Sequence, residues 1–185
     1  PETVINDASI DHDFRVESNG KTHAIFVDAG NDHVNINTSD DLGGDLNVDG
    51  GIVVQNGSNL DQLSLISTDA DANQGPNIRM YRNSSSPAND DTLGAVEFEG
   101  KNDAGQDVIY AKIRSLIADA ADGAEEGQLF IDLMKDGTVA RRLTMTGTSS
   151  VFNEDSGDID FRVESNGNAN MIFVDGGENH VGIGT

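Results

Sequence analysis

The 185-residue chain contains no cysteine and no tryptophan, and it has only 11 Lys or Arg residues against 33 Asp or Glu. Without cysteine it can form no disulfide, no thiolate metal site and no cysteine nucleophile. The net charge of −22 leaves no basic surface for nucleic acid and disfavours contact with an anionic membrane. Two explanations of the acidity stay open. One is solubility in a salty medium, where repulsion is screened beyond about 10 Å, and the other is binding of divalent cations.

Apolar residues are also scarce, at 36% of the chain with 5% aromatics, whereas glycine is abundant at 21 residues. No apolar stretch approaches the length of a membrane-spanning helix, and no secretory signal is visible. This composition is typical of many short strands joined by turns, and it would hardly fill one compact core. We therefore expect an extended fold or burial by oligomerisation. Because the sequence starts without Met and stops in mid-pattern, we expect a piece of a longer or processed polypeptide.

The dominant feature is an internal repeat, in which residues 5–38 align without a gap with residues 152–185 and 20 of 34 positions are identical. Alternation in DFRVE, a turn at SNG, a second apolar run in IFVD and a third alternating stretch in HVNI or HVGI predict a meander of three short strands. Repeats of this kind are usually stacked units rather than closed domains.

Each repeat carries only six or seven apolar side chains, too few to offset the ordering entropy of its residues. We therefore predict that each module packs against neighbours or against copies in other chains. The candidates for this packing are Phe14, Val16, Phe26, Val34, Ile36, Phe161, Val163, Phe173, Val181 and Ile183.

Between the modules lie a Gly-rich connector and a richer segment. In the connector, residues 39–58, alternation of Leu46 and Val48 favours a short strand over a flexible linker. About six strands are expected in residues 59–150, with turns at a spacing typical of an antiparallel sandwich or barrel-like domain. The predicted strands are 61–67, 77–82, 95–99, 108–114 and the two arms of a hairpin turning at Asp136-Gly137, with a helical alternative for 113–118.

No motif for catalysis is present. The sequence has no phosphate-binding loop, no nucleophile elbow and no His-Glu-x-x-His, and no carboxylate pair is specified. We therefore expect no enzymatic activity. His33 and His180 occupy equivalent positions before a strand, and we interpret them as solvent-facing turn residues.

Weak candidates for a cation site, Ca²⁺ being the fitting ion, are acidic pairs and a DADAN stretch. The stretch fails as an EF-hand because Gly and Glu are missing where that loop needs them. Asx turns that open the strands are the simpler explanation of the recurring pairs. The candidate ligands are Asp69, Asp71, Asn73, Asp11, Asp13, Asp158 and Asp160.

Arg15 and Arg162 stand at the same place in each module, with Glu17 and Glu164 two residues further on. In a chain with so few basic residues, a repeated Arg beside a Glu predicts a structural ion pair. A carboxylate partner would fix register best at a subunit contact.

The repeated motifs DFRVESNG, IFVD and HVGIGT, together with the LNVDGG connector, resemble repeats in tail-fibre and other virion fibre proteins of tailed bacteriophages, especially marine ones. Residues 80–88, 98–105 and 110–113 are similar to a segment found between such repeats. The resemblance implies an elongated, β-rich homotrimer on the outside of a virion, without a cofactor. Its partners would be itself, other virion proteins and a glycan or protein of the host surface, without nucleic acid or membrane insertion.

The sequence thus predicts an all-β, elongated trimeric β-fibre. Repeat modules at 1–38 and 151–185 would flank the connector at 39–58 and the central domain at 59–150. The predicted function is structural, in a tail or head fibre at the virion surface, with a contribution to host attachment. Two alternatives stay open: an extracellular bacterial adhesin or filament subunit, and a carbohydrate-binding module in the central domain that would use Tyr81, Tyr110, Phe98 and Phe130.

Overall fold

A computed structural model describes residues 4–6 and 8–184, so the predicted modules 1–38 and 151–185 include residues 1–3, 7 and 185, which lie outside it. Within the described residues the chain is all-β, with twelve strands and no helix. Accordingly, the described part of the chain offers no helix with the length and apolarity needed to cross a membrane. The chain divides into two units, residues 1–76 and 77–185, which are described separately.

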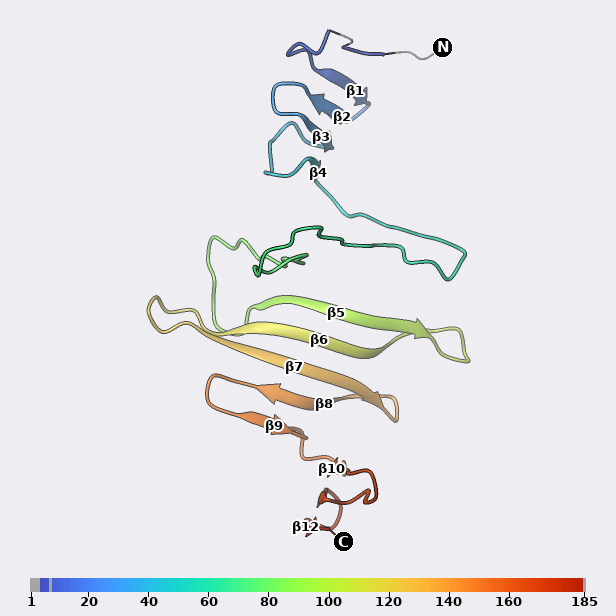
Figure 1. Cartoon of the computed structure of the whole chain (residues 1–185), viewed down its shortest axis with the longest axis vertical. Helices are drawn as coiled ribbons and strands as arrows, with labels where there is room; N and C mark the ends of the chain where they lie inside the picture. Colours follow the sequence, from blue (N-terminus) through green and yellow to red (C-terminus); the bar gives the residue numbers. More distant parts are fainter. Residues whose placement is uncertain (1–3, 7, 185) are drawn as a thin grey trace. The chain divides into compact units, whose positions relative to one another are not determined.

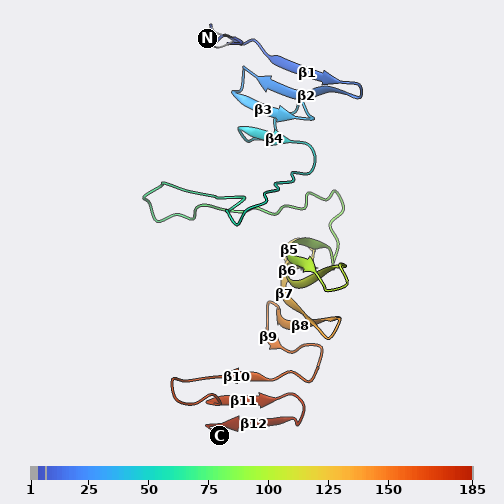
Figure 2. The ribbon, with the colours of Figure 1, turned by 90° about the vertical axis from the view of Figure 1, so that its right-hand side faces the viewer.

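The first unit contains one four-stranded sheet. Its strands are β1 (Phe14–Ser18), β2 (Lys21–Asp28), β3 (His33–Ile36) and β4 (Leu46–Val48). Neighbours in the sheet follow the chain, β1-β2-β3-β4, as Figure 2 shows. The first three strands form the predicted antiparallel meander, whereas β4 pairs parallel to β3. The connector therefore supplies a strand, as its Leu/Val alternation predicts.

Residues 49–76 carry no strand, and the strand predicted at 61–67 is wrong. Leu63 and Ile66 are 72% and 83% exposed there. The alternation of apolar residues shows only that a strand could be half-buried. A strand also needs a neighbouring edge for its backbone hydrogen bonds, and this segment has none among the described residues.

The second unit begins with a five-stranded antiparallel meander. Its strands are β5 (Thr92–Lys101), β6 (Asp107–Asp119), β7 (Glu126–Lys135), β8 (Thr138–Met145) and β9 (Ser150–Phe152). Figure 1 shows them side by side in chain order. The sequence predicts a sandwich or barrel here, but one chain forms only this single open sheet. Alternation and turn spacing specify strands, not the number of layers into which they pack.

Local chemistry explains the hairpin between β7 and β8. Asp136 and Gly137 have φ of 51° and 78°, the left-handed pair that a two-residue turn needs, as predicted. Residues 113–118 belong to strand β6, so the helical alternative is wrong. The strand predicted at 77–82 is also wrong, because those residues form no ladder.

The second repeat module forms a separate three-stranded sheet in this unit. Its strands are β10 (Phe161–Val163), β11 (Ile172–Asp175) and β12 (His180–Ile183), paired antiparallel in the order β10-β11-β12 (Figure 2). Phe161 pairs with Val174 as Phe14 pairs with Val27. The two copies thus share strand order and register, and the prediction of two three-strand meanders is confirmed.

The apolar core is very small. Among the described residues only Phe26 and Phe130 are buried hydrophobics, at 8% and 2% exposure. Four polar residues are buried as well, namely Asn35, Asn47, Asp132 and Thr144. Each sheet therefore stands largely as a single layer within one chain.

Candidate assembly surface

In each sheet, the pairing of the strands collects apolar side chains on one face. Residues paired directly across a sheet lie on the same face, and so do residues two apart on one strand. In the first unit this rule collects eight apolar residues on one face, which we call face A. They are Phe14, Val16, Ile25, Val27, Val34, Ile36, Leu46 and Val48.

The second module repeats face A. Its register collects Phe161, Val163, Ile172, Val174, Val181 and Ile183 on one side of the sheet. These side chains are poorly covered: Val181 is 69% exposed and Ile183 76%. Eight of the ten residues predicted to pack against other copies therefore lie on this apolar face of their own module. Phe26 and Phe173 lie on the opposite face.

That opposite face in the first unit is held by an amide pair. Asn47 Nδ2 donates to Asn35 Oδ1 at 2.8 Å, and both residues are buried. Phe26, on the same face, meets the ring of His23 edge-on at a centroid distance of 5.0 Å. The buried amides tie parallel strand β4 to β3, so the sequence LNV completes the first module instead of acting as a spacer.

The central sheet has a third uncovered apolar face. Val96 pairs with Ile113, Phe98 lies two residues beyond Val96, and Leu129 pairs with Met145. Seven large apolar side chains on this face are each between 38% and 54% exposed: Val96, Phe98, Ile113, Leu129, Leu133, Met145 and Phe152. Of these, sequence reasoning singled out only Phe98, and as a sugar-binding aromatic. Alternation in each strand could have revealed the others, once the strands were joined in one sheet.

Turns in both modules are fixed by aspartates. Asp13 Oδ1 accepts a hydrogen bond from the Ala29 amide at 3.1 Å, and Asp160 Oδ1 accepts one from the Gly176 amide at 3.1 Å. The aspartate that ends the middle strand caps the following turn in both copies. Asp28 Oδ1 accepts from the amides of Gly30 and Asn31. The bonds of Asp28 are local Asx interactions. Those of Asp13 and Asp160 reach an amide 16 residues along the chain, so they are not the strand-opening Asx turns that the sequence offered as the simpler explanation of the recurring pairs.

Hydrogen bonding also perturbs one of these carboxyls. The Asn31 side chain donates to Asp28 Oδ2 at 3.1 Å, and it is the largest cause that lowers the pKa of Asp28 below 3.8; the backbone amides of Asn31 and Gly30 act in the same direction. The hydrogen bonds of the folded turn therefore favour the ionised carboxylate of Asp28.

Each module opens on an asparagine loop that sequence reasoning missed. Asn6 donates through Nδ2 to the Ile10 carbonyl at 2.7 Å and accepts the Ile10 amide on Oδ1 at 3.2 Å. Asn153 forms the same closed pair with Gly157, at 2.8 and 3.0 Å. Asn6 and Asn153 also share a left-handed φ, 66° and 63°. Asn6 and Asn153 are identical in the repeat alignment, and this identity is the sequence signal from which the loop could have been predicted.

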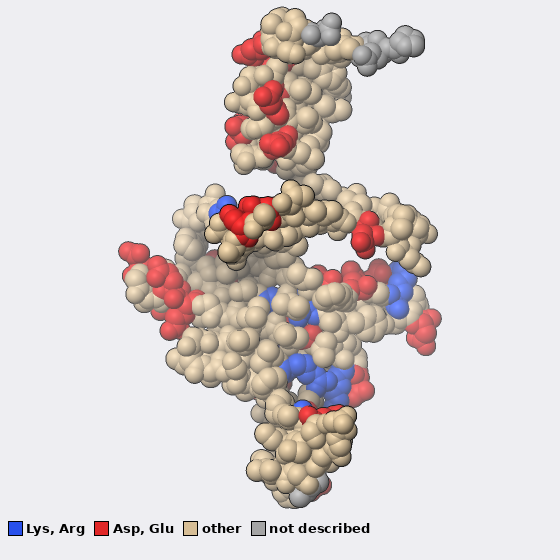
Figure 3. Space-filling view, viewed as in Figure 1, with Lys and Arg blue, Asp and Glu red and all other residues tan. Residues whose placement is uncertain are grey.

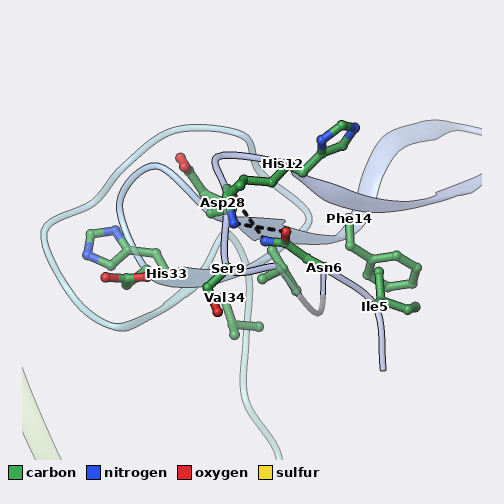
Figure 4. A pocket seen from close by; sticks show the side chains of 12 residues that line it. Ile5, Asn6, Ser9, His12, Phe14, Asp28, His33 and Val34 are labelled. Carbon is green, nitrogen blue, oxygen red and sulfur yellow. Dashed lines mark hydrogen bonds between the residues drawn. The ribbon is translucent and has the colours of Figure 1, made fainter. Parts of the chain in front are cut away.

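This loop bounds a hollow beside face A. Figure 4 shows Asn6 and its hydrogen bonds, with Ile5 next to Phe14 and with Val34 and His33 on β3. The hollow has a volume of about 410 Å³ in the first module. A hollow of about 330 Å³ lies in the second module, and all nine residues that line it are counterparts of residues in the first. Face A therefore carries the same recess twice.

The predicted cation ligands do not converge. Asp69, Asp71 and Asn73 form successive Asx turns, in which Asp69 accepts the Asp71 amide and Asp71 accepts the Asn73 amide. Backbone and side-chain hydrogen bonds from Asn73 lower the pKa of Asp71. Asp11 and Asp158 lie against Gly30 and Gly177, respectively. Across residues 4–6 and 8–184, no three His, Asp or Glu side chains are grouped for a metal ion.

The predicted arginine ion pairs are present in both modules. Arg15 Nη2 lies 2.7 Å from Glu17 Oε1, and Arg162 Nη2 lies 2.6 Å from Glu164 Oε1. All four side chains are about half exposed. His33, expected to face solvent, instead has a half-buried environment and lies 3.3 Å from Asp41 Oδ1.

The chain has a large accessible surface of 14213 Å², to which the uncovered faces and the exposed, strandless residues 49–76 both contribute. A compact monomer of 19.6 kDa exposes about 8,600 Å², and two compact halves of that mass expose about 10,300 Å² together. About 4,000 Å² of excess surface remains even in the second case. Obligate interfaces bury about 2,000–5,000 Å² counted over both partners, which is about 1,000–2,500 Å² for each. The extra surface of one chain is therefore larger than one partner's share of such an interface.

Comparisons with protein-family models, with curated proteins and with solved structures found no match. The fold and the site together define an all-β chain of single-layer sheets, each with one uncovered apolar face.

Proposed function

We propose that the chain is a non-enzymatic structural protein of a bacteriophage fibre, assembled as a homotrimer through its uncovered sheet faces. The observation that carries the proposal is the repetition of face A, with the same register and the same recess, in two modules of a chain whose described residues include only two buried hydrophobic side chains. A single-layer sheet is not stable alone, because its apolar face must be buried against another layer.

Copies of the chain are the occupants that fit these faces best. Face A and its counterpart in the second module consist of apolar side chains without a charged residue among them. The same face of another copy of the chain can therefore pack against it. A symmetric oligomer brings the same patch of each subunit together, and the repeat then presents it twice per chain. Most of the acidic residues lie outside the strands, in turns and loops, where charge repulsion between copies is screened by salt.

The assignment to a virion fibre is supported by the sequence motifs of the repeat and the connector. The observed strand order of the modules is compatible with that resemblance. An extracellular bacterial adhesin or filament built from the same modules is the competing function, since the same faces would serve it.

Imaging of intact phage particles tests the assignment. Antibody fragments raised against the central sheet should decorate projecting fibres of the virion, in a tail or head position. Decoration of bacterial surface filaments in uninfected cells, with bare virions, would assign the chain to the adhesin class instead.

A further inference from the structure

The face of the central sheet opposite its apolar side gathers basic residues in an otherwise acidic chain. Figure 3 shows Lys and Arg side chains over the region of β6–β8. By register, Lys112, Arg114 and Arg141 lie on this face with Asp132 between them. Asp132 is 5% exposed, so its charge is compensated inside the sheet rather than by solvent.

Arg114 is held rigidly by two contacts. Its Nε donates to Asp132 Oδ2 at 2.8 Å, and its guanidinium carbon lies 4.2 Å above the centre of the Phe130 ring. Arg141 flanks the same ring, at 4.6 Å, and its Nε lies 3.9 Å from Asp132 Oδ1. Stacking and the carboxylate fix the plane of the Arg114 guanidinium, while no described residue accepts from its terminal amino groups. A guanidinium so oriented is prepared to bind a carboxylate through two hydrogen bonds.

A hollow of about 280 Å³ lies beside this guanidinium. Its lining includes Tyr110, Lys112, Arg114, Met134 and Val139, and also Asp132, the carboxylate that holds Arg114. Tyr110 is 45% exposed and Val139 53%, so the hollow combines an accessible aromatic ring and an apolar wall with the guanidinium of Arg114. The second cation, Lys112, is paired with Glu97 at 2.6 Å, so Arg114 is the cation left to bind a ligand. One further polar group on this face is unsatisfied: the Thr144 hydroxyl, cross-strand from Phe130, is buried without a hydrogen-bond partner among the described residues.

We propose that this hollow binds a carboxylated sugar, a hexuronic acid residue of a surface glycan. The carboxylate would take the terminal amino groups of Arg114, and the C–H face of the sugar ring would stack on Tyr110. The strongly negative chain repels long polyanions, which favours a glycan carrying isolated carboxylates. The inference rests on the proposed function, since a fibre at a virion surface is where such a sugar would be met.

Titration of the full chain with galacturonic acid and, as the matched neutral sugar, galactose tests the proposal by calorimetry. The acid should bind at least about 10-fold more tightly than galactose, because one charge-assisted pair is worth roughly that factor. Arg114→Lys keeps the charge but loses the planar fork, and it should remove that preference. Tyr110→Ala should weaken both sugars. Lys101→Gln, a change of an exposed basic residue elsewhere on the sheet, should leave the titration unchanged.

Equal binding of the two sugars, or binding of neither, overturns the inference. Loss of the oligomer in Arg114→Lys, measured by light scattering, also overturns it, because Arg114 would then bind a carboxylate of another copy. Neither result touches the proposed function, which fails separately if the wild-type chain is monomeric. Thermal melting of each variant checks that it is folded.

Discussion

The two repeat modules share the asparagine loop and the turn after the middle strand, but they differ in the first hairpin and along one strand face. Both have the asparagine loop, the aspartate-capped turns and the Arg–Glu pair. At one position, however, the first module has buried Asn35, bonded to Asn47 of an added parallel strand, whereas the second has Gly182. The shared loop and turn residues therefore keep the strand order of the module, whereas the face opposite face A differs between the two copies.

The largest effect is expected from placing a charge on face A. Val34→Asp and Val181→Asp would each bury an unpaired carboxylate in every subunit contact, at a cost of several kcal/mol. Light scattering should show loss of the oligomer in both. Asn19→Asp and Asn166→Asp add the same charge at an exposed turn and serve as controls. If the Val34 and Val181 variants stay assembled like these controls, face A is not the contact.

Next comes the amide pair that distinguishes the modules. Asn35→Gly copies the second module and leaves Asn47 buried without its acceptor, so unfolding of the first unit should become easier by about 1–3 kcal/mol. The reverse change, Gly182→Asn, should alter stability by under about 0.5 kcal/mol, since β12 has no such partner. Denaturant melts of the two variants measure the contrast. Equal effects would mean that the buried pair contributes nothing specific.

A smaller, local effect is expected from acid. Because hydrogen bonds lower the pKa of Asp28 below 3.8, its carboxylate stabilises the turn above the unfolded value, and that contribution is lost as pH falls through the lowered pKa. The Asn31 amide should thus change its NMR shift with a midpoint below pH 3.8. Asp28→Asn should abolish that titration. A midpoint above 3.8 would contradict the hydrogen-bonded turn.

The smallest effect should come from the repeated ion pairs. Arg15→Gln and Arg162→Gln remove half-exposed pairs, and such pairs contribute under about 1 kcal/mol. Thermal melts of the two variants should shift little and by equal amounts. A large loss in only one would place that arginine in a subunit contact.

Sequence patterns predicted the modules well because their turns carry local signals. Asn19-Gly20 closes the hairpin between β1 and β2, and Asp136-Gly137 closes the one between β7 and β8. In the second module, however, Asn166-Gly167 lies in a longer loop between β10 and β11. The alternation at 61–67 and 77–82 was misleading, since pairing depends on a distant edge that periodicity does not encode. Register was likewise inaccessible in the run Ile25-Phe26-Val27, where apolar side chains point to both faces. The central apolar face was missed because it forms only when five separate strands align.

The mass of the chain in solution tests the account most directly. Multi-angle light scattering at physiological salt should give three times the 19.6 kDa of one chain, because the proposed homotrimer covers the apolar sheet faces with copies of the chain. A single species of 19.6 kDa, with a cooperative melt, would contradict it.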